Sequence, residues 1–244
     1  MLNLSPFALL IASLFLLPVV SMAQNLGNQS KQSFKKKIRI TVGAKYLLYL
    51  PVDYGKDKKK RWPLIMFLHG SGESGDNLDI VAKHGLPQLI AEGKEFPFII
   101  VSPQASSADR GWDNDMLNAL LDTIMKNYRV DKDRVYITGL SMGGYGTWSF
   151  AIAHPDRFAA IAPVSAGGNA SKVYKLKDVP VWVFHGALDT TVPLQEDQNM
   201  ANALKAAGGN VKFTIYPDLG HDCWTQTYEN QKLYDWFLKH KLAK

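Results

Sequence analysis

The fold is decided by one stretch of the chain, Val135-Tyr-Ile-Thr-Gly139-Leu-Ser141-Met-Gly143-Gly-Tyr-Gly146. It opens with an apolar, β-branched run that is typical of a buried strand, and it closes with small residues that suit a closely packed helix. Ser141 stands between them in the pattern G-x-S-x-G. A serine on a sharp strand-to-helix turn needs small neighbours two residues to either side, and Gly139 and Gly143 meet that need. The stretch therefore predicts a turn that presents Ser141 as a nucleophile; a structural glycine-rich turn is the alternative.

Outward from this stretch, short apolar runs alternate with amphipathic segments. Strands are expected at residues 38–42, 46–51, 63–69, 98–101, 135–138, 159–164, 181–184 and 211–216. Helices are expected after Ser141 as far as Pro155, and at 115–128, 193–207 and 226–240. This alternation predicts an α/β fold with a mostly parallel central sheet and helices on both faces. The first two strands, joined through Gly43, predict an N-terminal antiparallel hairpin.

The composition is that of a globular protein, and the length fits one large domain as well as two small ones. The 244 residues are 46% hydrophobic and 20% charged, with 19 Gly and 12 Pro, which excludes disorder, collagen-like repeats and coiled coil. The single cysteine, Cys223, excludes an internal disulfide framework and a cysteine-based zinc cluster. Because no repeat or low-complexity linker divides the chain, we expect one catalytic domain over residues 38–244.

The first residues predict an export signal. Residues 1–23 carry no charged side chain, and the apolar run from Pro6 to Val20 is 15 residues long, shorter than the roughly 20 that a spanning helix needs. Small residues at Ser21 and Ala23 predict cleavage before Gln24. We expect a signal peptide over 1–23, a polar and basic spacer over 24–37, and a secreted or periplasmic product without stable membrane insertion. An uncleaved N-terminal anchor is the alternative, since no Lys or Arg precedes the run.

The net charge of +6 is unevenly spread. Residues 31–61 hold 11 Lys and Arg against 2 Asp, whereas residues 62–244 hold 17 Lys and Arg against 20 Asp and Glu. A polyanion-binding surface is one interpretation of the basic segment. No aromatic residues are interleaved with these charges to stack on bases, so we expect solvated loops and no nucleic-acid partner.

A serine hydroxyl is a weak nucleophile, so a base and an orienting acid are expected in loops after later strands, in the order Ser, Asp, His. Asp189 lies four residues past His185, where the next-to-last strand ends, and His221 follows the last strand. These positions predict a catalytic triad of Ser141, Asp189 and His221. Asp197 is a weaker candidate for the acid because it lies inside an expected helix, and His185 is expected to be structural.

The reaction also needs amide donors for a developing oxyanion. The N–H of Met142, directly after the nucleophile, is one expected donor. The loop from His69 to Gly75 is rich in glycine and is expected to supply the second. The alternative, a phosphate-binding loop, lacks both the Lys-Ser/Thr of a P-loop and the G-x-G-x-x-G spacing. No metal or organic cofactor is implied.

Four motifs together resemble the α/β-hydrolase superfamily. They are His69-Gly-Ser-Gly-Glu73, the Gly139–Gly146 elbow, His185-Gly-x-x-Asp189-x-x-Val-Pro193 and Gly220-His221. Over about residues 38–240 the chain is similar to the secreted esterase branch that groups feruloyl-esterase-like, polyhydroxybutyrate-depolymerase-like and "predicted peptidase" proteins. The resemblance implies an α/β-hydrolase fold and implies that Ser71 supplies the second oxyanion amide.

The segment between two of the expected strands bears on the shape of the cleft. Only 16 residues separate the strand ending near Val164 from the one starting at Val181, where related lipases carry a lid. We therefore expect no large lid and an open cleft. Trp112 and Trp224 are candidate substrate-binding residues at its rim, with a packing role as the alternative for each.

These features lead to an expected function. The chain is expected to be a serine esterase that cleaves carboxylic esters through an acyl-enzyme, with a small-molecule or polysaccharide-linked substrate such as a feruloyl, acetyl or other sugar- or aryl-linked ester. A serine peptidase with the same triad is the alternative, and a non-catalytic carbohydrate-binding protein is a third class. Cys223 lies two residues past His221, but it has no turn or oxyanion donors of its own, so we expect it to pack. The sequence does not indicate the oligomeric state.

Overall fold

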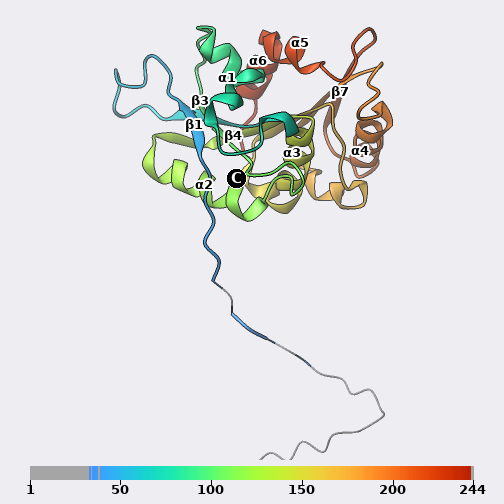
Figure 1. The fold of residues 1–244 in the computed structure, drawn as a ribbon, viewed down its shortest axis with the longest axis horizontal. Coiled ribbons are helices and arrows are strands. Elements are labelled where there is room, and N and C mark those ends of the chain that lie inside the picture. Colours follow the sequence, from blue (N-terminus) through green and yellow to red (C-terminus); the bar gives the residue numbers. More distant parts are fainter. Residues whose placement is uncertain (1–32, 34, 38, 243–244) are drawn as a thin grey trace, which may run out of the picture. The chain divides into compact units, whose positions relative to one another are not determined.

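The computed structural model describes residues 33, 35–37 and 39–242 (Figure 1). The chain divides into two units, Met1–Ile40 and Thr41–Lys244, and the helices and strands of the described residues belong to the second. The expected signal peptide and its cleavage site lie outside the described residues. None of the helices in the described part of the chain is long and apolar enough to cross a membrane.

The second unit is built on a mostly parallel sheet, as the alternation of strands and helices predicted. Within the described residues the sheet has seven strands in the order β1-β3-β2-β4-β5-β6-β7, and each neighbouring pair except β1 with β3 is parallel. The strands are β1 (Tyr46–Tyr49), β2 (Trp62–Leu68), β3 (Ile99–Pro103), β4 (Val130–Leu140), β5 (Ala160–Val164), β6 (Val181–Gly186) and β7 (Val211–Tyr216).

The antiparallel strand pair at the N-terminal edge is present, but its partner differs from the expected one. β1 pairs with β3, with Tyr46 opposite Pro103 and Tyr49 opposite Ile100. Residues 39–42 form no strand, and Ile38 lies outside the described residues. β3 is buried along its whole length, so its outer row of backbone groups needs a partner, and β1 supplies it.

Helices cover both faces of the sheet (Figure 1). They are α1 (Gly85–Ala91), α2 (Asn114–Asn127), α3 (Met142–Ala153), α4 (Leu194–Ala206), α5 (Trp224–Glu229) and α6 (Gln231–Lys239). Side chains of α2, α3 and α4 belong to one core cluster, and side chains of α1, α5 and α6 belong to the other. Both faces of the inner strands are therefore apolar, which explains the continuous hydrophobic runs in the sequence.

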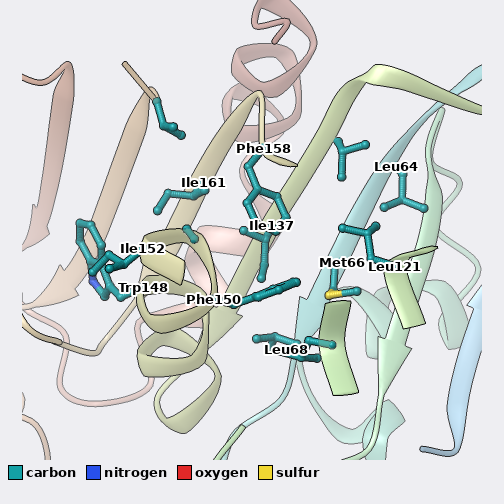
Figure 2. Packing of buried hydrophobic residues seen from close by; sticks show 14 of the residues in the cluster. Leu64, Met66, Leu68, Leu121, Ile137, Trp148, Phe150, Ile152, Phe158 and Ile161 are labelled. Atoms are coloured by element: carbon teal, nitrogen blue, oxygen red, sulfur yellow. The ribbon is translucent and has the colours of Figure 1, made fainter. Parts of the chain in front are cut away.

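Successive side chains along a strand belong alternately to the two clusters. Leu64, Met66 and Leu68 of β2 point into the first cluster, to which Phe150 of α3 also belongs (Figure 2). Ile65 lies between them in sequence and belongs to the second cluster. This alternation follows from the two-residue repeat of a strand.

One expected helix is broken in two. Residues 226–240 were expected to form one helix, but Asn230 separates α5 from α6. Its backbone is extended, and its side chain accepts a hydrogen bond from the N–H of Lys232, which caps the start of α6. α1 was not expected. In the described stretch between β5 and β6 there is a 3-10 segment, Ala170–Leu176, and no inserted lid, as expected.

Candidate active site

Ser141 lies on the sharp turn between β4 and α3. Its backbone has a φ of 52°, a left-handed conformation that non-glycine residues rarely adopt. The N–H of Ser141 donates to the Val164 carbonyl, 2.9 Å away. A Cβ on Gly139 would overlap the backbone of Gly143, and a Cβ on Gly143 would overlap the Leu68 carbonyl. The turn can therefore form only with glycine at these two positions.

The three side chains expected to form a triad lie in one hydrogen-bonded row. His221 Nε2 is 2.9 Å from Ser141 Oγ, and His221 Nδ1 is 2.7 Å from Asp189 Oδ2. The other carboxylate oxygen of Asp189 accepts from the N–H groups of Thr191 and Val192, at 2.9 and 2.8 Å. Because the carboxylate of Asp189 can only accept, it holds the proton of His221 on Nδ1 and leaves Nε2 free to accept the serine proton.

A second buried His–Asp pair lies behind this row. His185 Nδ1 is 2.8 Å from Asp197 Oδ2, and His185 Nε2 is 2.9 Å from the Val192 carbonyl and 3.3 Å from Asp189 Oδ2. Asp197 also accepts from the indole N–H of Trp148 at 3.0 Å. The two aspartates thus have different partners, since Asp189 orients His221 and Asp197 binds His185.

The charge of this second pair follows from its contacts. The Val192 carbonyl accepts only, so Nε2 of His185 carries a proton, and Nδ1 faces a carboxylate. Burial acts to lower the pKa of His185, but the hydrogen bonds to Asp197 and Val192, with the charges of both aspartates, raise it above its ordinary value. Both ring nitrogens of the buried His185 thus bind protein groups. The role of Asp197 was missed, although its place in the first turn of the helix after Val192-Pro193 was a usable signal.

The glycine-rich loop after β2 lies directly against the nucleophile. A Cβ on Gly70 would be 3.7 Å from Ser141 Cβ. Ser71 opens a short 3-10 turn, Ser71–Glu73, and Met142 is the first residue of α3, so both amides belong to helix starts that leave N–H groups without an intrahelical partner. Both expected oxyanion donors therefore lie at helix starts near Ser141, since Met142 follows it in the chain and Ser71 follows Gly70.

His69 fixes the peptide group that carries the Ser71 amide. The N–H of Ala105 donates to His69 Nε2 at 3.0 Å, so that nitrogen has no proton and Nδ1 carries it. Nδ1 lies 2.5 Å from the Gly70 carbonyl, to which it donates. Burial lowers the pKa of His69, which agrees with a neutral ring. Since the carbonyl and the N–H of one peptide point in opposite directions, this bond turns the Ser71 N–H away from His69.

The two expected substrate-binding tryptophans occupy different places. The ring of Trp224 lies 5.1 Å from that of His221 and 6.0 Å from that of His84, each edge to face. Trp112 lies 4.8 Å from His69, behind the glycine-rich loop. Both indole N–H groups are buried and have no hydrogen-bond partner among the described residues. Trp224 is thus beside the candidate triad, whereas Trp112 supports the loop next to it.

Cys223 is not placed to act as a nucleophile. It is fully buried, and its Sγ lies 3.1 Å from Ser165 Oγ. Burial raises the pKa of the Cys223 thiol to about 12, so the thiol stays protonated at neutral pH. Elsewhere in the described residues, no group of three or more His, Cys, Asp or Glu side chains is arranged to hold a metal ion.

Known proteins match this chain over most of its length. The family model described as "Putative esterase" matches residues 39–236. An endo-1,4-beta-xylanase/feruloyl esterase of Xylanibacter ruminicola is 29% identical over 196 residues, which cover 73% of this chain and 27% of that protein. The chain thus spans about a quarter of the length of this relative.

Two solved structures agree with the family match. A thermostable esterase is 32% identical with a TM-score of 0.66, covering 80% of this chain and 59% of that one. A ferulic acid esterase is 26% identical with a TM-score of 0.59, covering 78% of this chain and 89% of that one. These matches confirm the resemblance to the esterase branch of the α/β hydrolases. The chain belongs to the family described as "Putative esterase" and has an α/β-hydrolase fold.

Proposed function

We propose that the protein is a secreted serine esterase in which Ser141, His221 and Asp189 form the catalytic triad. The observation that carries this proposal is the unbroken row of hydrogen bonds from Ser141 Oγ through the His221 imidazole to the Asp189 carboxylate, at 2.9 and 2.7 Å. The strained backbone of Ser141 supports it, because strain at a buried turn is retained where it presents a reactive group.

The proposed reaction has two halves. Ser141 Oγ attacks the acyl carbon while His221 Nε2 accepts the hydroxyl proton, and His221 then gives this proton to the leaving alkoxide. The products of this half are the free alcohol and an acyl ester on Ser141. In the second half, water attacks the acyl-enzyme as His221 accepts its proton, and Ser141 leaves with that proton restored. Asp189 keeps the imidazole in the required tautomer throughout.

The negative charge that develops on the acyl oxygen is proposed to be held by the amides of Met142 and Ser71. The Ser71 amide is turned by a fixed peptide group, because His69 binds the Gly70 carbonyl on the opposite side. An amide that is already oriented stabilises the oxyanion without reorganisation during the reaction. The Met142 amide is also held in a fixed orientation, because it belongs to the first turn of α3.

The proposed substrates are short carboxylic esters with aryl or sugar-linked groups. The names of the similar proteins, a feruloyl esterase and a ferulic acid esterase, favour this class. Trp224 stands edge to face with His221 and offers an aromatic wall beside the reacting group. Export through a signal peptide over residues 1–23 remains part of the proposal, since polysaccharide-linked esters occur outside the cell.

Covalent labelling tests the assignment of the nucleophile. A fluorophosphonate reacts with an activated serine, and we expect one label per chain, which peptide mass spectrometry places on Ser141. The Ser141→Ala variant and the heat-denatured parent are the controls, and neither should be labelled. A label on another residue of the native protein would contradict the proposed triad.

A further inference from the structure

The end of β5 and the turn after it, residues 164–166, contact the loops of Ser141 and His221 and are linked to the loop of Asp189 through two buried side chains. The Val164 carbonyl accepts from the N–H of Ser141 at 2.9 Å. The N–H of Ala166 donates at 2.9 Å to Asp197, whose partner His185 lies against the catalytic acid. The loop that carries His221 is bound by the side chain of Ser165, the residue between Val164 and Ala166.

Ser165 has an unusual backbone. Its φ is 49°, and among the described residues it shares a positive φ with only one other non-glycine residue, Ser141. It is fully buried, and its N–H donates to the Phe184 carbonyl of β6 at 2.9 Å. A positive φ is unfavourable for a non-glycine residue, and such strain is concentrated at functional sites. Glycine adopts this backbone conformation more easily than serine, so the presence of a serine side chain here has to be explained by what the side chain contacts.

The hydrogen bonds of the Ser165 side chain explain why a serine is present. Its Oγ lies 2.9 Å from the backbone carbonyl of His221, and because a carbonyl only accepts, the serine hydroxyl must donate. With that proton used, the contact at 3.1 Å between Ser165 Oγ and Cys223 Sγ requires the thiol to donate. The N–H of Cys223 gives the His221 carbonyl its second hydrogen bond, at 2.9 Å. The carbonyl of His221 is therefore fixed from two directions.

We propose that Ser165 is a positioning residue for His221: its hydroxyl fixes the backbone of the histidine and so sets the place of the imidazole over Ser141. The inference rests on the proposed function. Ser165 lies behind the histidine and touches no reacting atom. The two left-handed serines hold His221 at opposite ends, since Ser141 Oγ bonds to the ring and Ser165 Oγ bonds to the main chain.

The strain and the hydrogen bond are linked by geometry. In an α or β conformation the Cα–Cβ bond of Ser165 would point in another direction, and its Oγ would leave the His221 carbonyl. The left-handed backbone therefore aims the hydroxyl, and two substitutions separate its effects. Ser165→Ala removes the hydroxyl and keeps the strain, whereas Ser165→Gly removes the hydroxyl and relieves the strain.

Steady-state hydrolysis of nitrophenyl acetate by both variants tests the proposal. We expect kcat to fall about tenfold or more in each, because small displacements of a catalytic group cost up to about 10²-fold. KM should stay within about twofold, since acylation and deacylation both use His221 and slow together. The melting temperature of Ser165→Gly should equal or exceed that of Ser165→Ala. Similar losses of kcat in two variants of different stability are a result that a packing role does not produce.

Thr138→Val is the matched control. Thr138 is also fully buried, and its hydroxyl donates to a backbone carbonyl, that of Ala162 on β5. Its loss should lower the melting temperature while kcat stays close to that of the parent. A valine has nearly the shape of a threonine, so the control removes the two hydrogen bonds of this hydroxyl, to the Ala162 carbonyl and to Tyr228 Oη, and little else. The Ser165 hydroxyl likewise has two partners.

The outcomes separate this inference from the proposed function. Parental kcat in Ser165→Gly, or an equal loss of kcat in Thr138→Val, would overturn the positioning role while Ser141 is still labelled and the parent is active. A parent protein that hydrolyses no ester and takes no label at Ser141 would instead remove the proposed function, and this inference with it.

Discussion

At the scale of single residues, the Ser141 hydroxyl bonds to His221, whereas backbone contacts hold the turn around it. The variant Ser141→Ala should therefore lower kcat/KM for a nitrophenyl ester by about 10³-fold or more and leave the melting temperature nearly unchanged. Steady-state kinetics and thermal unfolding check this. If the variant, in a sample free of parent protein, turned over as fast as the parent, the nucleophile would have to be a residue other than Ser141.

The Cys223 thiol allows a second test at this scale. Because burial raises its pKa to about 12, an alkylating reagent at pH 8 should modify native Cys223 far more slowly than the same cysteine in urea. Intact-protein mass spectrometry follows the reaction. Cys223→Ser should keep turnover within about tenfold, since no step of the proposed reaction uses the thiol. Loss of all turnover in a folded Cys223→Ser protein would restore the thiol as a candidate nucleophile.

At the scale of elements, the buried pair His185–Asp197 joins β6 to α4, and the Asp189 loop lies against it. Asp189 and Asp197 are both buried and both bind a histidine, so they form a matched pair for substitution. Asp189→Asn should lower kcat by about 10³-fold or more, because the wrong imidazole tautomer is then favoured. Asp197→Asn should keep kcat within about tenfold and lower the free energy of unfolding. Steady-state assays with urea unfolding of both variants decide this, and equal losses of kcat would contradict the separate roles.

The raised pKa of His185 also predicts how stability depends on pH. A histidine whose pKa is higher in the folded state stabilises the protein fully below its unfolded pKa, about 6.5. That stabilisation is lost as pH rises through the folded pKa. The free energy of unfolding of the parent should thus fall as pH rises above about 6.5, and Asp197→Asn should show a weaker fall. Urea unfolding over this range measures both, and parallel curves would contradict the charged pair.

Much of this arrangement could be predicted from local sequence, and the exceptions share a cause. Ser141, Asp189 and His221 follow expected strands, so their loops were placed by strand order alone. Ser165 was missed because nothing in a local pattern indicates a left-handed serine after a buried strand. The role of Asp197 was missed because helical periodicity predicts that a residue is buried but does not predict which polar group it binds. The predicted partner of β1 was wrong because strand pairing depends on which strand, far away in the sequence, has an unpaired edge in the folded sheet.

At the scale of the whole molecule, the described residues from Thr41 onward form one sheet, the helices that cover it and the segments that connect them. A peptidase must align an extended chain and protonate a leaving nitrogen, and the described residues hold no inserted cap to build such subsites. We therefore expect ready hydrolysis of nitrophenyl acetate and at most trace cleavage of peptide nitroanilides, comparing kcat/KM after division by the uncatalysed rates. A peptide that exceeds every ester on this scale would favour the serine peptidase.

The order of the strands along the chain has a consequence for biosynthesis. His221 follows β7, the last strand of the described residues, and it lies 80 residues beyond the serine with which it shares a hydrogen bond. A ribosome-bound or clipped chain that ends before β7 would hold a nucleophile without its base. Because the proposed triad is complete only when this strand has joined the sheet, we expect a chain that ends before β7 to hydrolyse esters no faster than Ser141→Ala.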